Sequence, residues 1–219
     1  MPSTFSHQLV SDRILEFDCQ DCTEQDRIAL YYGLSGHPDK PSGWAVALTG
    51  QKISLIARHA LTEVNAIQPL IHFAHSVFSQ GPVMSPTEVE QHQFEVVFND
   101  ECGPDLERVA KLNGLTVDQW IKRFLAGRYQ VAFNGFLPGF SYLSGLPEGL
   151  QAPRLENPRA KVLAGSLAIA GSYCAIYPTD SPGGWNIVGW VNRKVFSANQ
   201  SPPCLMAPGD CVSFRWQHD

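Results

Sequence analysis

The hydrophobic and polar positions of the first half alternate between strand-like and helix-like stretches. Residues 6–17 have the pattern of one strand. A helix is expected to follow, with Asp21 or Thr23 as its N-cap and an end near Gly33. The order of these patterns predicts a first half built from both strands and helices.

The best helical pattern of the first half covers residues 59–79, where apolar residues recur at steps of three and four. Pro69 is expected to kink this helix or split it in two. Two short strands are predicted before it, at 44–48 and 53–57, joined by a hairpin-type turn. The apolar residues of the helical pattern are Leu61, Val64, Ile67, Leu70, Ile71, Ala74 and Phe78.

A polar stretch with two prolines, residues 82–92, interrupts the pattern. We interpret it as the boundary between two domains, residues 1–88 and 89–219. After it, a strand is expected at 94–98.

Two helices are expected next. Asp105 is the expected N-cap of the first, which ends at Gly114, and Thr116 opens the second, which ends at Gly127. One face of the second helix is apolar: Trp120, Ile121 and Phe124. A closing strand is expected at the end of the chain, with apolar residues alternating at Val212, Phe214 and Trp216.

Between the second of these helices and the closing strand, residues 131–190 combine short apolar runs with regularly recurring glycine and proline. Proline fixes φ and removes a hydrogen-bond donor, while glycine allows positive φ and close backbone approach. This composition excludes a helix and predicts the short strands and tight turns of a β-barrel or sandwich.

Composition narrows the class of protein. The 219 residues are 44% hydrophobic and 17% charged, which is typical of a globular protein. A net charge of −5 argues against non-specific nucleic-acid binding. Residues 1–20 lack the features of a signal peptide, and no apolar run reaches 18 residues. These observations predict a cytoplasmic protein without a membrane span.

Metal binding is not expected. Cys19 and Cys22 form a C-x-x-C pair, but no second pair with similar spacing completes a zinc site. His72 and His75 lie three residues apart on one helical face, again without a third ligand. The six cysteines are expected to be reduced thiols.

Two arginines directly follow prolines, at Arg154 and Arg159. A stiff, extended backbone suits a guanidinium that must meet a carboxylate or phosphate through two parallel hydrogen bonds. The alternative is that these arginines pair with acids of the chain itself, and the sequence leaves both open. The acids considered are Glu148, Glu156 and Asp180.

The turn predicted at 181–185 contains Gly183 and Gly184, whose backbone N–H groups could form an anion-binding nest. A plain hairpin turn is an equal alternative. Ser166 is a possible nucleophile, although no histidine lies near it in sequence, and no catalytic residue is identified. The candidate binding residues are Phe136, Pro138, Gly139, Tyr142, Arg154, Arg159, Ser166, Ser181, Gly183, Gly184 and Trp185.

Several motifs between about residues 94 and 216 together resemble one family, which contains the B subunit of 5-oxoprolinase, allophanate hydrolase subunit 1 and the kinase inhibitor KipI. They are Gly103–Leu106, Gly135–Leu143, Gly145–Pro147, Ala152–Arg154, Pro158–Arg159, Gly165–Gly171, Ile176–Pro178, Ser181–Trp185 and Pro208–Asp210.

The resemblance implies a mainly β protein: a cyclophilin-like β-barrel as the C-terminal domain and a small α+β domain before it. It also implies a subunit of an ATP-dependent 5-oxoprolinase-like or allophanate-hydrolase-like amidohydrolase. Such a subunit acts on a small anionic amide with a related partner, of the type of KipA or of the C subunit of 5-oxoprolinase. The alternatives are a KipI-like, non-catalytic inhibitor that binds a sensor histidine kinase, and a peptide-binding barrel.

The chain departs from the family pattern at several positions. Phe124 stands where the family usually has a histidine, which removes the best candidate for acid–base chemistry. Leu163 stands where a proline is usual, and Tyr173-Cys174-Ala175 replaces a Gln-Thr-Gly. The usual Arg-Thr-Pro is replaced by Trp190, Val191 and Asn192. These departures predict either a different substrate or a pocket that binds without catalysing.

Overall fold

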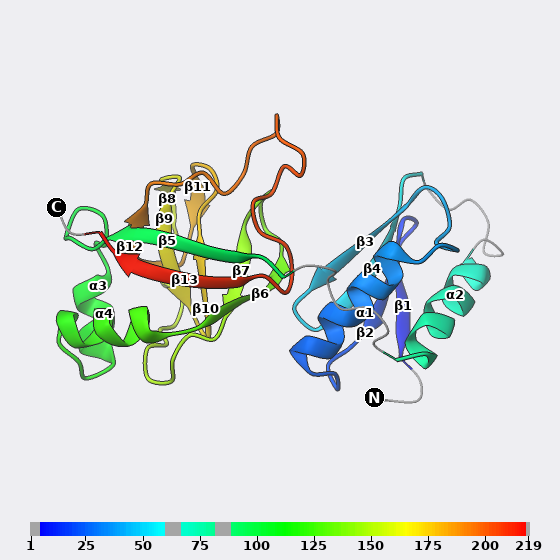
Figure 1. The fold of residues 1–219 in the computed structure, drawn as a ribbon, viewed down its shortest axis with the longest axis horizontal. Helices are drawn as coiled ribbons and strands as arrows, with labels where there is room; N and C mark the ends of the chain where they lie inside the picture. Colours follow the sequence, from blue (N-terminus) through cyan, green and yellow to red (C-terminus); the bar gives the residue numbers. More distant parts are fainter. Residues whose placement is uncertain (1–4, 60–66, 82–88, 218–219) are drawn as a thin grey trace. The chain divides into compact units, whose positions relative to one another are not determined.

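The computed structural model describes residues 5–59, 67–81 and 89–217 (Figure 1). Residue contacts divide the chain into two compact units, Met1–Glu88 and Val89–Asp219. Each unit is described by itself below.

The first unit contains an antiparallel sheet with strand order β1-β2-β4-β3. The single strand predicted at 6–17 is wrong, because the polar residues Asp12 and Arg13 turn the chain back on itself and Leu9 pairs with Leu15. The hairpin predicted from the two short strand patterns is confirmed. The strands are β1 (His7–Ser11), β2 (Ile14–Asp18), β3 (Trp44–Thr49) and β4 (Lys52–Ala57).

Helix α1 (Glu24–Gly36) begins at one of the two predicted N-caps, Thr23. The Thr23 side chain accepts a hydrogen bond from the Asp26 backbone, and the Asp26 carboxylate accepts one from the Thr23 backbone N–H. The helix continues past its predicted end at Gly33. Gly33 is buried, and a Cβ there would lie 3.3 Å from Val77, so glycine permits close packing instead of ending the helix.

Helix α2 (Ile67–Ser79) packs through Phe78 on Phe17 of β2, with ring centroids 5.2 Å apart. Pro69 lies in the first turn of α2, where its missing N–H costs no helical hydrogen bond, so the predicted kink is not seen in the described helix. The predicted helical residues Leu61 and Val64 lie outside the described residues.

The second unit is built on a closed barrel of strand order β10-β7-β6-β13-β5-β12-β9. The closing strand pairs in parallel with β5, and the other neighbouring strands pair antiparallel. A barrel leaves no open sheet edge among its own strands. The mainly β fold with a C-terminal β-barrel is confirmed. The strands are β5 (Gln91–Val97), β6 (Tyr129–Asn134), β7 (Ser141–Ser144), β9 (Ser166–Ala170), β10 (Tyr173–Ile176), β12 (Asn186–Val191) and β13 (Cys211–Trp216).

The end of the predicted linker 82–92 belongs to this barrel, while residues 82–88 lie outside the described residues. His92 is buried in β5, and its Nε2 lies 3.0 Å from Oδ2 of buried Asp210. Burial opposes ionisation of Asp210, but the bonds from His92 and from the Ala207 and Glu90 N–H groups outweigh it and lower the pKa of that carboxyl. That the two units fold independently stays a prediction.

Helices α3 (Leu106–Leu112) and α4 (Val117–Ala126) pack on barrel strands β12 and β13. The capping prediction for α4 is confirmed, because Thr116 and Gln119 cap each other reciprocally. Asp105 occupies the N-cap position of α3, but its side chain makes no capping bond.

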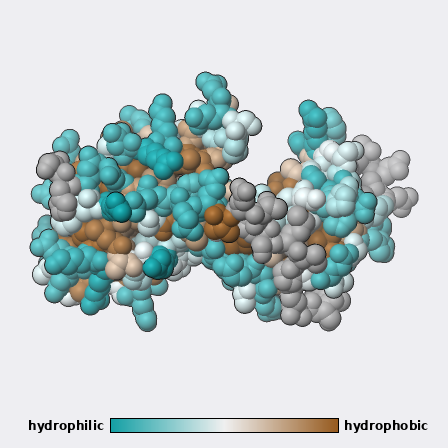
Figure 2. Space-filling model, viewed as in Figure 1, coloured by the Kyte–Doolittle hydropathy of each residue, from teal (hydrophilic) through white to brown (hydrophobic). Residues whose placement is uncertain are grey.

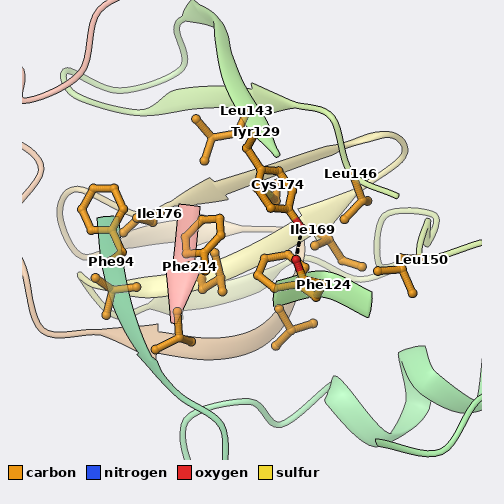
Figure 3. Close-up of a cluster of buried hydrophobic side chains, with 14 of the residues drawn as sticks. Phe94, Phe124, Tyr129, Leu143, Leu146, Leu150, Ile169, Cys174, Ile176 and Phe214 are labelled. Carbon is orange, nitrogen blue, oxygen red and sulfur yellow. Dashed lines mark hydrogen bonds between the residues drawn. The ribbon is translucent and has the colours of Figure 1, made fainter. Parts of the chain in front are cut away.

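Buried aromatic side chains form part of the barrel core (Figure 3). Phe124 has no exposed surface and stacks on Trp120 at 5.1 Å. The Tyr129 hydroxyl donates a 2.8 Å hydrogen bond to the Phe124 carbonyl. Truncating such a ring to alanine typically costs about 3–5 kcal/mol.

On the face shown in Figure 2, hydrophilic residues predominate and hydrophobic ones surface in separate patches. Among the described residues, the large hydrophobic side chains that are exposed are Leu9, Val10, Val89, Leu112, Phe136 and Leu163. None of the described helices combines the length and the apolar character needed to cross a membrane.

Candidate functional site

A strained turn presents an aromatic ring at the end of β6. Phe136 has φ +68°, a left-handed conformation that bulky residues rarely adopt. The Leu137 N–H donates to the Gly135 carbonyl at 2.8 Å, so Phe136 is the central residue of a three-residue γ-turn. Its side chain is 61% exposed. Strain combined with exposure of a large ring is typical of a functional site.

Pro138 and Gly139 form the next turn. The Phe140 N–H donates to the Leu137 carbonyl at 3.0 Å, and Gly139 has φ +81°, as expected for the third residue of a type II turn. A Cβ on Gly139 would lie 2.5 Å from Phe196, so no other residue fits. Both residues shape the loop that carries the aromatic rings.

These rings enclose a cavity of about 250 Å³, which we call the aromatic pocket. Phe140 lies against Tyr177 and Trp185 in edge-to-face contacts at 5.2 and 5.4 Å, and Tyr142 lies 5.4 Å from Trp185. The pocket is lined by Phe136, Tyr142, Arg154, Pro158, Tyr177, Pro182, Gly183, Gly184 and Trp185.

Arg154 supplies the positive charge of the aromatic pocket. It is exposed, and within the described ranges no acidic group forms an ion pair with it. Burial raises the pKa of Tyr142, and the Arg154 guanidinium opposes that rise, which places this charge near the Tyr142 hydroxyl. Burial likewise raises the pKa of Tyr177, and the neighbouring backbone of Trp185 opposes this rise.

The glycine pair beside this arginine does not form a nest, which was one of two equal alternatives. Residues Ser181–Gly183 are strand β11, which pairs with β8 (Arg159–Val162), and neither Gly183 nor Gly184 has positive φ. A nest needs a left-handed residue in its backbone. Gly183 is required for another reason: a Cβ there would lie 2.2 Å from the Tyr177 hydroxyl oxygen.

Arg159 has an acidic partner, and it is none of the three acids considered from sequence. Its Nη2 lies 2.9 Å from Oδ1 of Asp105, whose side chain is 7% exposed. The other carboxylate oxygen of Asp105 accepts the Ile187 N–H at 2.7 Å. Asp105 therefore ties β8 to β12 through the loop before α3. In the sequence, the signal that singles out Asp105 as a site residue is its place in the Gly103–Leu106 motif.

Arg159 and Ser166 line a second cavity of about 670 Å³, which we call the Ser166 pocket. The eleven predicted residues are thus divided. Six line the aromatic pocket, two line the Ser166 pocket, and Pro138, Gly139 and Ser181 line neither. The aromatic-pocket residues that the prediction missed are Pro158, Tyr177 and Pro182, although Tyr177 lies in a motif that carried the resemblance.

The departures from the family pattern also have distinct places. Phe124 lies in the barrel core and lines neither pocket, so a histidine there would be buried among aromatic rings. Leu163 and Trp190 both line the Ser166 pocket. The Trp190 indole N–H donates to the Ala164 carbonyl at 2.9 Å.

Metal-ligand chemistry has no support in the described ranges, where no group of three or more potential ligands comes together. All six cysteines are free, and Cys19 and Cys22 are buried. Burial, followed by the neighbouring Cys22, raises the pKa of Cys19 to about 12, so that thiol stays protonated at neutral pH.

Comparison with known proteins gives the family. Residues 49–206 match the model of the carboxyltransferase domain, subdomain C and D. The chain is 42% identical over 147 residues to the B subunit of 5-oxoprolinase from Haemophilus influenzae, covering 67% of this chain and 68% of that protein. It is 40% identical over 122 residues to the B subunit of 5-oxoprolinase from Bacillus subtilis, covering 56% of this chain and 51% of that protein.

A solved structure extends the similarity to both units. The crystal structure of TTHA0988 aligns with a TM-score of 0.73 at 27% identity, covering 94% of this chain and 40% of that one. The aligned part thus spans about half of the Bacillus subtilis relative and less than half of TTHA0988. The resemblance predicted from the motifs is confirmed, and the chain belongs to the carboxyltransferase family, subdomain C and D, that includes the B subunit of 5-oxoprolinase.

Proposed function

We propose that this chain is a subunit of a 5-oxoprolinase-type amidohydrolase and that its aromatic pocket holds a small anionic amide or lactam. One observation carries the proposal: Arg154, without an ion-pair partner in the described ranges, stands beside aromatic rings within residues 49–206, the part of the chain that matches the carboxyltransferase-domain model. A guanidinium recognises a carboxylate through parallel hydrogen bonds. In 5-oxoproline, the carboxylate would meet Arg154 and the flat ring would lie against Tyr142 or Trp185.

The aromatic pocket does not fit a nucleotide. A triphosphate needs several donors or a nest, while the pocket has one unpaired arginine among the described residues and no left-handed backbone at Gly183 and Gly184. We therefore assign any ATP-dependent step to a related second subunit. In this division of roles, the present chain binds and orients the substrate, and the rings exclude water from it.

The proposal is tested by exchanging subunits. This chain would replace the B subunit in the Haemophilus influenzae enzyme, and ATP-dependent conversion of 5-oxoproline to glutamate would be measured. We expect activity with the wild-type chain and little with Arg154→Ala. If the enzyme's own B subunit supports turnover and this chain does not, although it co-purifies with the complex, the proposed function is wrong.

A further inference from the structure

The Ser166 pocket is larger than the aromatic pocket, and the proposed function does not use it. Its volume of about 670 Å³ falls within the usual range for small-molecule sites. Strand β8 and the loop that follows it supply one part of the wall, and β12 and the loop before α3 supply others. Its lining residues include Glu101, Arg159, Lys161, Leu163, Ser166 and Trp190.

The hydroxyl of a nearly buried serine, Ser166, lies on the wall of this pocket. Ser166 as a residue is only 6% exposed, and its hydroxyl, which borders the cavity, makes no hydrogen bond to another described residue. Its backbone groups are occupied, since its N–H bonds to Leu163 and its carbonyl accepts from Tyr177. A hydroxyl that borders a cavity and has no protein partner is available to donate a hydrogen bond to a ligand.

The charges around the pocket are already compensated by acids of the chain. Arg159 is paired with Asp105 through Nη2, while its Nη1 is buried without a hydrogen-bond partner in the described residues, and Lys161 lies 2.9 Å from Asp180. Glu101 is exposed to solvent at the rim. A charged group inserted as far as Ser166 would meet no free opposite charge, and burial of an unpaired charge is costly. A neutral hydrogen-bonding group incurs no such cost.

The remaining wall is apolar. Val162 and Ile187 are buried, Trp190 is half-buried, and Leu163 is 56% exposed although it borders a cavity. An exposed leucine beside a flat indole provides a surface that a planar apolar group would cover.

We propose that the Ser166 pocket is a second ligand site, which takes an uncharged molecule with a flat apolar body and one carbonyl group. The carbonyl accepts a hydrogen bond from the Ser166 hydroxyl, and the body lies between Leu163 and Trp190. The two pockets thus differ in ligand charge: an anion beside Arg154 and a neutral molecule beside Ser166. This inference is independent of the proposed function.

The test uses three probes with the same body and different heads: 3-phenylpropionamide, 3-phenylpropionate and 3-phenylpropylamine. Binding to the full chain would be followed by the indole N–H signals of the tryptophans in NMR spectra. Trp190→Phe and Trp185→Phe identify the signal of each pocket. We expect the amide to shift the Trp190 signal in a saturable way, more tightly than either charged probe, and to leave Trp185 unmoved.

Two substitutions locate the site. Ser166→Ala should weaken amide binding about fivefold, as the loss of one neutral hydrogen bond does, with little change in melting temperature. Leu163→Ser should also weaken it several-fold, whereas Leu112→Ser, a matched leucine on α3 with 55% exposure, should not. The proposal is overturned if the Trp190 signal does not shift, if a charged probe binds best, or if Ser166→Ala binds the amide like wild type.

A parallel titration with 5-oxoproline separates this inference from the proposed function. That ligand should shift the Trp185 signal and leave Trp190 unmoved. If the amide fails to bind, the 5-oxoproline titration still tests the proposed function. If 5-oxoproline fails to bind, the amide titration still tests the Ser166 pocket.

Discussion

Arg154 and Arg159 have nearly the same sequence context and opposite environments. Each follows a proline within one short segment, and the sequence offered the same two interpretations for both. In the structure, Arg154 borders the aromatic pocket without an acidic partner in the described ranges, whereas Arg159 is bound to buried Asp105 and borders the Ser166 pocket. A proline before an arginine stiffens the backbone that carries it. Whether the guanidinium is free to bind a ligand depends on an acidic residue that is distant in sequence.

The largest loss of stability is expected from changing Asp105, the carboxylate that binds Arg159 but not Arg154. Asp105→Asn leaves Arg159 without its charged partner and keeps one acceptor oxygen where Arg159 and the Ile187 N–H now have two. We expect the free energy of unfolding to fall by about 3 kcal/mol, as when one member of a buried ion pair is removed. Urea denaturation at neutral pH measures it.

The matched control for this substitution is Asp180→Asn, which breaks the solvent-exposed pair with Lys161. It should change stability little, because water and salt screen exposed ion pairs. Equal losses for the two variants would show that Arg159 is not held by Asp105 in solution.

The second prediction concerns the wall of the aromatic pocket. Gly183→Ala places a methyl group 2.2 Å from the Tyr177 hydroxyl oxygen and should destabilise the protein by about 2 kcal/mol through overpacking. Gly184→Ala is the control, since its Cβ would have an ordinary 3.4 Å contact with Pro158. If thermal melts rank the two variants in the reverse order, Gly183 is not selected by packing.

Much of the fold could be predicted from periodicity and local chemistry. The β3–β4 hairpin, the capping box of α4 and the alternating burial of β13 follow from patterns within a few residues. The turn between β1 and β2 is not predicted from the sequence, because its residues Asp12 and Arg13 are neither glycine nor proline. The end of α1 was misplaced because the reason for Gly33 is contact with α2, which no local pattern reports.

The candidate site was less predictable, for the same physical reason. Sequence placed aromatic rings and two arginines in one segment, and six of the eleven candidates do line one pocket. Which arginine is free depends on Asp105, which precedes Arg159 by more than fifty residues. The role of Gly183 depends on Tyr177, which lies just after β10 and is six residues earlier in the chain. The substrate assignment and the independence of the two units stay predictions, and limited proteolysis near residues 82–92 would test the latter.

The third prediction tests the free arginine by binding. Arg154→Lys keeps the charge and loses the planar fork, so 5-oxoproline should bind more weakly by about 1.5 kcal/mol, while the melting temperature stays unchanged. Arg159→Lys should do the opposite: lower stability and unchanged binding. Calorimetric titrations and thermal melts of the two variants measure both. A fall in stability for Arg154→Lys with intact binding would assign it a structural role.

The smallest effect is a titration that reports where the Arg154 charge lies. The pKa of Tyr142 is raised by burial, and the nearby guanidinium opposes this rise because it stabilises the phenolate. Arg154→Ala should therefore raise the pKa of Tyr142 further. Tyrosine labelled with carbon-13 at Cζ gives one NMR signal for each of the six tyrosines, and Tyr142→Phe identifies the relevant one. Arg215→Ala, which removes an exposed arginine on β13, should leave the Tyr142 titration unchanged. If Arg154→Ala also leaves it unchanged, the guanidinium does not stand at the aromatic pocket, and Arg154 cannot be the group that holds an anion there.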